Sequence, residues 1–312
     1  MTGYLYACNG AAWRLPPLLS WSLEHTAAGA ADAFEIRFAY TAEMNAMLAS
    51  AYRFRAEEAG ETVFYGVVDE CATLLSEDGA VTEVSGRGLA ALLLDSEAEA
   101  KEYYSCALSD ILRDHAAPYG VTDSDADAMG RAALYRVASG SSEWKALADF
   151  AAWVGGVTPR FSKSGRLVLR KKADGRVRLG QDCGVVAARR RIRRYGVVSE
   201  AVVKGNTNGA RSVVKNEAFL ALGGACRRVV CVPNETGCGA MRYTGEYQIA
   251  RSAADYDTAE VTLIKPLAAF AGSEAEISLP RAGLDGVFFI RESRSWADGD
   301  GCGTRLTLVP GG

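Results

Sequence analysis

Short segments in which apolar and polar residues alternate recur along this chain, and turn residues separate them. Near the N-terminus, Trp21 and Leu23 alternate with polar neighbours, and residues 34–38 repeat the pattern after the small, flexible stretch AAGAAD. An alternation with a period of two places one face of a strand in the core and the other in water. Two such segments joined by a short loop predict an antiparallel hairpin. A series of these hairpins restricts the chain to a mainly β fold.

Two more hairpins are expected before residue 85. EEAGE separates the strands of the first, and SEDGA separates those of the second, where Asp78-Gly79 provides a tight turn. Three consecutive hairpins predict a meander that closes into a small barrel or sandwich. The strands of these two hairpins are expected at residues 52–55, 62–68, 74–75 and 81–84.

The apolar pattern changes to a helical period in residues 86–120. Apolar residues recur there at i, i+3 and i+4, which predicts two short helices. Ser105 is the expected N-cap of the second helix. His115 lies on the stripe of that helix in its last turn, where a positive charge favours the helix dipole. The two stripes consist of Leu89, Leu92 and Leu93, and of Leu108, Ile111 and Leu112.

A third helix is expected at residues 144–151, with Ser142 or the serine before it as its cap and Glu143 in its first turn. Residues 120–140 are polar and rich in Asp, and we expect them to form a loop. A further hairpin is expected over residues 159–170, where SKSG is the turn. These elements predict a small α/β insertion between two β-rich halves.

The rest of the chain is expected to form short strands without a long helix. Turn signals such as Gly205-Asn206 and Asn208-Gly209 separate them. Regular short strands predict a second antiparallel barrel. The strands are expected at residues 185–192, 197–204, 212–214, 227–232, 246–250, 259–264, 276–279, 287–291 and 305–309.

The predicted domains are an N-terminal β-barrel at residues 1–85, the α/β insertion at 86–175 and a second β-barrel at 176–312, which can interleave with the first two. The charge is unevenly distributed among them. Residues 57–127 contain 17 acidic and 3 basic residues, and residues 160–194 contain 13 basic and 2 acidic residues. Two opposed charged regions indicate an oriented surface that meets other subunits.

The densest basic run is the candidate subunit contact. On a strand its arginines point to both faces, which suits an edge or a subunit contact better than a groove that follows a phosphate backbone. The net charge of −3 is also unlike that of a dedicated nucleic-acid binder. The run consists of Arg189, Arg190, Arg191, Arg193 and Arg194.

The sequence predicts no catalytic, cofactor-binding or metal-binding residues. The only histidines are His25 and His115, for which we expect structural roles, and no GxSxG or phosphate-binding glycine motif occurs. The carboxylates of residues 95–99 lie in a polar linker. The eight cysteines form no CxxC pair and are expected to be reduced thiols. We expect no signal peptide and no membrane anchor, because the longest apolar runs, such as residues 89–94, are too short.

Several segments, taken in order, resemble a known family. VFYGVVDE at 63–70 is followed by VSGRGLAALLLDSEAE at 84–99, and a helix ends in PYG at 118–120. This order resembles the baseplate hub proteins of contractile phage tails, of the Mu-like and defective-prophage late-control-D type. The family's later motifs look like Trp144 to Val154, Phe161 with Gly165-Arg166-Leu167, Gly286 to Glu292 and Thr304 to Leu308. Gly88 departs from the Ser or Thr that the family often has.

The resemblance implies a structural virion protein with two barrels related to the tail-tube fold. It implies a homotrimer whose three protomers form a pseudo-sixfold ring between the hexameric tail tube and the trimeric spike. The implied partners are the tail tube protein, the spike protein and other baseplate proteins, and assembly would occur in the bacterial cytoplasm. Nucleic acid is expected only in transient passage through the pore.

Two other functions stay open at this point. A tail-associated cell-wall hydrolase needs two of His25, His115, Cys226 and the carboxylates to converge in a pocket. A tail component that contacts nucleic acid would use the basic run at 189–194 and would show binding that weakens steeply with salt.

Overall fold

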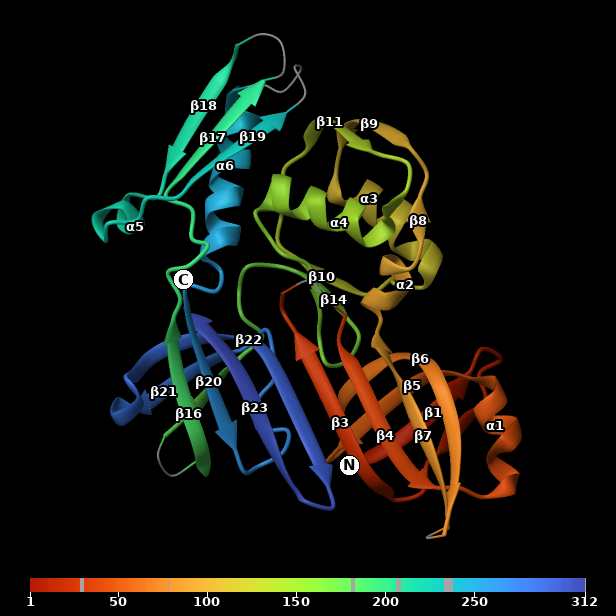
Figure 1. Ribbon diagram of the computed structural model, residues 1–312. Helices are drawn as coiled ribbons and strands as arrows, with labels where there is room; N and C mark the ends of the chain where they lie inside the picture. The colour runs from red at the N-terminus through yellow and green to blue at the C-terminus, as the bar shows by residue number, and fades with distance from the viewer. Residues whose placement is uncertain (29–30, 78, 181–182, 206–208, 233–237, 312) are drawn as a thin grey trace. The chain divides into compact units, whose positions relative to one another are not determined.

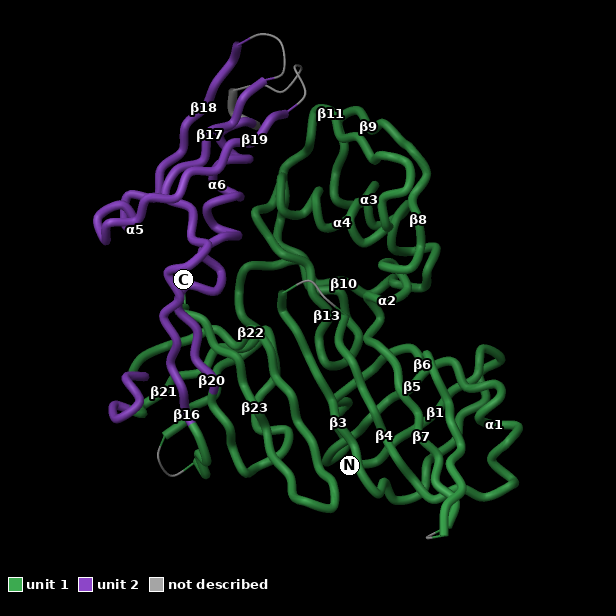
Figure 2. Tube along the Cα trace, viewed as in Figure 1, with its two compact units in different colours: residues 1–187, 261–279, 285–312 green, residues 188–260, 280–284 purple. Residues whose placement is uncertain are grey.

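The computed structural model of the chain describes residues 1–28, 31–77, 79–180, 183–205, 209–232 and 238–311 (Figure 1). The chain divides into two compact units (Figure 2). Unit 1 consists of Met1–Ala187, Val261–Leu279 and Asp285–Gly312, and unit 2 consists of Ala188–Glu260 and Pro280–Leu284. The predicted turns at Asp78-Gly79, Gly205-Asn206 and Asn208-Gly209 each include a residue outside the described ones.

A large sheet joins strands from both ends of the sequence. Among the described residues it has 13 strands, in the order β16-β20-β23-β22-β3-β4-β7-β6-β5-β1-β2, and β21 pairs with β22 and β15. The N-terminal strands are β1 (Thr2–Ala7), β2 (Ala12–Arg14), β3 (Leu18–Thr26), β4 (Ala33–Ala39), β5 (Ala51–Glu58), β6 (Glu61–Ser76) and β7 (Gly79–Gly88). The C-terminal strands are β15 (Arg176–Leu179), β16 (Val185–Ile192), β20 (Asp257–Leu263), β21 (Glu274–Leu279), β22 (Leu284–Asp298) and β23 (Gly301–Pro310).

The three predicted hairpins are confirmed, but the predicted meander is wrong. β3 pairs with β4, β5 with β6 and β6 with β7, all antiparallel. β4 does not continue to β5, because η1 (Ala42–Met44) and α1 (Asn45–Ser50) intervene, and its partner is β7. The β4–β7 register places Phe34 opposite Gly86 and Ile36 opposite Val84. A Cβ at Gly86 would lie 2.7 Å from the Phe34 ring, so the glycine makes room for this core aromatic.

The N-terminal strands enclose an aromatic core. The rings of Phe34 and Phe54 stack with centroids 4.3 Å apart, and Phe64 meets Phe34 edge-on at 5.3 Å. Such offset and edge-on contacts add stability beyond the burial of the rings. The side chains of Leu5, Leu23, Ile36, Phe38 and Val84 complete this core.

The insertion contains the three predicted helices. They are α2 (Ala90–Leu94), α3 (Leu108–His115) and α4 (Glu143–Phe150), and η2 (Ala117–Tyr119) and η3 (Ala151–Gly155) follow the last two of them. The short strands are β8 (Glu97–Ala98), β9 (Lys101–Cys106), β10 (Ser124–Ala126), β11 (Ala132–Val137), β12 (Ser141–Ser142), β13 (Arg160–Phe161) and β14 (Leu167–Leu169). The β13–β14 hairpin is confirmed.

Two local predictions in the insertion are wrong. Residues 120–140 contain β10 and β11, because these segments pair with β14 and β9, which lie far away in the sequence, and β11 buries Ala132, Tyr135 and Val137. The N-cap of α3 is Ala107 rather than Ser105, which instead accepts hydrogen bonds from Arg131. The cap of α4 is confirmed: the Ser142 side chain accepts from the backbone N–H of Lys145.

Unit 2 has one small mixed sheet and a helix that the sequence does not predict. β17 (Glu200–Gly205) lies between antiparallel β18 (Arg211–Lys215) and parallel β19 (Arg227–Val232). The strand predicted at residues 246–250 is instead part of α6 (Cys238–Ala253), and the expectation of no long helix is wrong. Tertiary packing overrides local preference here, because Gly245 brings α6 close to the side chains of β17 and β18. The unit also contains α5 (Glu217–Ala221) and η4 (Pro280–Ala282).

The chain is mainly β with largely antiparallel sheets, as the sequence predicts. Among the described strands, the large sheet runs as an open path from β16 to β2. The two barrels and the domain bounds at 85 and 175 therefore stay predictions. Within the described ranges, no helix is both long and apolar enough to cross a membrane.

Candidate functional site

The structure divides the predicted basic run into two groups. Arg190 is held within unit 2, where its guanidinium contacts both carboxylate oxygens of Asp257 at 3.0 and 2.7 Å and the carbonyl of Gly283 at 2.7 Å. Arg193 lies 4.0 Å from Asp255 and 5.6 Å from the ring centroid of Tyr195. These two arginines stabilise the local fold.

The other three arginines of the run are exposed. Arg189 and Arg191 are two positions apart on β16 and therefore point to the same face. Arg194 follows the end of the strand and is also exposed. None of the three makes an ion pair within the part of the chain that the structure describes. The predicted subunit contact stays a prediction, and Arg189, Arg191 and Arg194 are its members that have no ion pair among the described residues.

Some of the opposed charge of the sequence is neutralised inside unit 1. Three basic residues of the 160–194 segment pair with acidic residues of the 57–127 segment at 2.9–3.0 Å. These pairs are Lys163–Glu61, Arg166–Asp123 and Arg170–Asp125. The two units still differ in charge. Unit 2 has 13 basic and 7 acidic residues, and unit 1 has 22 basic and 31 acidic residues.

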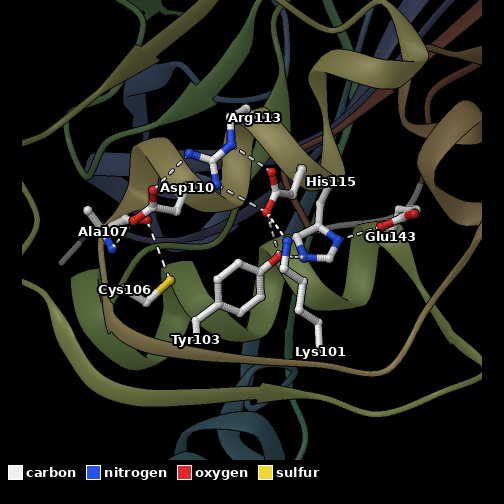
Figure 3. Close-up of polar contacts among 9 residues, drawn as sticks. Lys101, Tyr103, Cys106, Ala107, Asp110, Arg113, His115 and Glu143 are labelled. Carbon is white, nitrogen blue, oxygen red and sulfur yellow. Dashed lines mark hydrogen bonds and ion pairs between the residues drawn. The ribbon is translucent and has the colours of Figure 1, made fainter.

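The histidine in the insertion forms a buried polar chain that the sequence does not predict (Figure 3). His115 Nδ1 lies 2.5 Å from Glu143 Oε2, and both side chains are more than nine-tenths buried. On the other side of the ring, His115 Nε2 lies 2.8 Å from the hydroxyl of Tyr103. Tyr119 donates to the second oxygen of Glu143 at 2.8 Å.

Counting protons assigns the direction of these bonds. Tyr103 has one hydroxyl proton, which it donates to Asp114 Oδ2 at 3.0 Å. The bond from His115 to Tyr103 must therefore be donated by His115 Nε2–H. The other ring nitrogen, His115 Nδ1, forms the hydrogen bond with Glu143 Oε2. The chain of bonds reaches solvent through Lys101, which lies 2.6 Å from Asp114.

The burial of this cluster favours a structural role, as the sequence predicts for His115. A catalytic base must reach a substrate, and His115 is almost fully enclosed by the apolar core of the insertion. Both of its ring nitrogens are already bonded. The network connects β9, η2, α3 and α4, so its role is to hold the helices of the insertion together.

The second histidine lines a hollow of about 330 Å³ in unit 1, together with Asp32 and Ser293. A nucleophilic triad requires hydrogen bonds between such residues, but each one bonds elsewhere. His25 Nε2 donates to the carbonyl of Val63 at 2.9 Å, Asp32 accepts from the backbone of Thr26, and Ser293 accepts from that of Ala271. Burial lowers the pKa of His25 to about 4 and raises that of Asp32 to about 7.

The described cysteines are free thiols, and no three described His, Cys, Asp or Glu side chains are grouped to hold a metal ion. The side chain of Cys238 lies outside the described ones. Cys226 is exposed, and neither histidine is its partner, since both bond elsewhere.

Known structures share the fold of the chain, although no family model and no curated protein sequence matches it. The prophage MuSo2 43 kDa tail protein from Shewanella oneidensis is 19% identical, with a TM-score of 0.79 over 99% of this chain and 98% of that one. The tail protein from Neisseria meningitidis MC58 is 18% identical, with a TM-score of 0.79 over 98% and 95%. The Escherichia coli c3393 protein, a type VI secretion component with structural similarity to T4 tail proteins gp27 and gp5, is 13% identical, with a TM-score of 0.62 over 95% and 74%. The expected similarity to tail proteins is thus confirmed for the fold.

Proposed function

We propose that this chain is the structural baseplate hub protein of a contractile phage tail, or of a tail particle derived from a phage. One observation carries the proposal: the fold matches two tail proteins over almost the whole length of both chains. A match of this extent includes the insertion and unit 2 as well as the large sheet. It therefore concerns the whole architecture rather than one common β domain.

In this proposal three copies form a ring that joins the hexameric tail tube to the trimeric spike. Each protomer contributes two tail-tube-like barrels, one from residues 1–85 and one from 176–312, with the insertion at 86–175 between them. The pairing of β22 with β3 joins strands of the two halves in one sheet, so the two halves would be held side by side in each protomer. Three protomers with two similar halves each would present six similar units to the hexameric tube. The same ring has three protomers, which matches the trimeric spike.

The proposed role is assembly at the virion baseplate after synthesis in the bacterial cytoplasm. It involves no catalysis and no cofactor, and nucleic acid only passes through the pore. Support comes from His25 and His115, which bond within the fold instead of forming a reactive pair. Arg189, Arg191 and Arg194 form the proposed contact with a neighbouring subunit.

Co-expression with the tube and spike proteins of the same particle tests the proposal. Native mass spectrometry of the purified complexes should reveal three copies of this chain with three spike chains, and binding of the tube protein to that complex. A chain that associates with neither protein would contradict the proposed function. Cleavage of purified cell wall by the chain alone would favour the hydrolase instead.

A further inference from the structure

The distal half of β6 has a free edge. β5 pairs with β6 only as far as Val67, whereas β7 accompanies β6 to Ser76. Residues 69–75 therefore have a strand on one side and no strand on the other among the described residues. An unpaired edge of this length is a template for a strand from another chain. No proline blocks it.

The same segment exposes apolar side chains on both faces. Leu74 is 46% exposed and Leu75 is 85% exposed, and neighbours on a strand point to opposite faces. Exposed leucines on both faces of a hairpin arm indicate contact with another surface rather than with the core of the same chain.

The free charges on this arm are negative. Glu70 and Glu77 are exposed and make no ion pair among the described residues. Two nearby carboxylates form ion pairs within the chain: Asp69 pairs with Arg87 at 2.7 Å, and Glu83 pairs with Arg37. The arm therefore presents leucines accompanied by two free glutamates.

The basic edge of unit 2 is complementary to this arm. β16 ends the path of the large sheet, so it also has a free edge within the described chain. Beside Arg189 and Arg191 it carries Ile192, which is 51% exposed, and Tyr195 follows at 83% exposed. This edge presents apolar side chains accompanied by free arginines.

We propose that the β6–β7 arm of one copy docks along β16 of a second copy, with Glu70 of β6 facing Arg189 and Arg191. This inference rests on the proposed function, because it names the partner of the arginine surface. Pairing of two β16 edges would oppose arginines, and pairing of two arms would oppose glutamates, so only the unlike pairing is favourable. Every copy carries both surfaces, and the contact therefore repeats head to tail and can close into a ring.

Charge reversal tests the pairing. Arg189→Glu/Arg191→Glu and Glu70→Arg should each weaken self-association at least tenfold in sedimentation at low salt. The chain carrying all three substitutions should associate again, because the charges are then reversed on both sides of every contact. The matched control is Arg211→Glu/Arg251→Glu, which changes the charge equally at exposed positions of unit 2 outside β16 and should leave association unchanged. Thermal unfolding of each variant checks that it is folded.

The outcomes separate this interface from the proposed function. A wild-type ring that persists in both Arg189→Glu/Arg191→Glu and Glu70→Arg would overturn the interface alone. A folded chain with all three substitutions that does not associate would overturn it as well. Loss of DNA binding as the only effect of Arg189→Glu/Arg191→Glu would also overturn it, in favour of a nucleic-acid contact. A wild-type chain that never associates would contradict the proposed function itself.

Discussion

His115 Nδ1 lies 2.5 Å from Glu143 Oε2, and this bond joins the last residue of α3 to the first residue of α4. The two residues are 28 positions apart. Because both are buried, the removal of one leaves the other without its partner in the core. The bond therefore fixes how the two helices of the insertion pack, and it gives the first prediction.

Glu143→Ala should lower the free energy of unfolding by about 2–4 kcal/mol, because it leaves a buried imidazole unpaired. Urea denaturation measures the change. Glu97→Ala is the control, since Glu97 is exposed on β8 and its loss should have almost no effect. Equal effects of the two substitutions would show that the buried bond does not stabilise the insertion.

Asp114 should make the chain more stable at neutral pH than in acid. Arg113, Lys101 and Tyr103 bond to its carboxylate and hold the pKa of Asp114 well below the usual value. The unfolded chain then binds a proton that the folded chain does not, so this contribution is lost as pH falls through about 5 to 2. The stability difference between the wild type and Asp114→Asn should be largest near pH 7 and should shrink in acid. A difference independent of pH would contradict this assignment.

Asp32 should have the opposite effect. Burial raises its pKa to about 7, so between about pH 4 and 7 the folded chain holds a proton that the unfolded chain releases. Asp32 therefore reduces stability as pH rises through that range. Asp32→Asn keeps an acceptor for the Thr26 N–H, and the melting temperature of this variant should gain on the wild type from pH 4 to 8. If the difference in melting temperature between Asp32→Asn and the wild type did not change with pH, the raised pKa of Asp32 would be contradicted.

Gly86 should be intolerant of a side chain. A Cβ there would lie 2.0 Å from the Val67 carbonyl oxygen and 2.7 Å from the Phe34 ring, and a backbone oxygen cannot move aside. Gly86→Ala should destabilise the fold by about 2–4 kcal/mol. Gly175→Ala is the matched control, because no described atom lies within 4 Å of the position that its Cβ would take. Similar chemical denaturation midpoints for both variants would contradict the close packing of Gly86 on β7 against β6 and the Phe34 ring.

Local features of the fold were predictable from the sequence, and distant pairings were not. The hairpins and helices α2 to α4 depend on nearby residues and turn signals, so periodicity reveals them. The pairing of β4 with β7 and of β22 with β3 depends on contacts between distant segments. Helix α6 was missed because its tyrosines, threonine and glycines are weak helix formers, and its packing against β17 and β18 stabilises it.

The candidate surface was predictable only in outline. The run of arginines is visible in the sequence. The carboxylates that form ion pairs with Arg190 and Arg193 belong to Asp257 and Asp255, which lie about 60 residues later. The free edge of β6 also required the structure, because its length is set by where β5 stops. The exposure of Leu74 and Leu75 on this edge likewise required the structure, because other apolar pairs of β6, such as Val63-Phe64, are buried.

Assembly as a trimeric hub is tested most directly by native mass spectrometry over a range of protein concentrations. We expect a trimer, alone or with the spike protein bound, that image averaging resolves as a ring with a central pore. A strict monomer at high concentration, which never trimerises with its spike protein, would contradict the proposed hub.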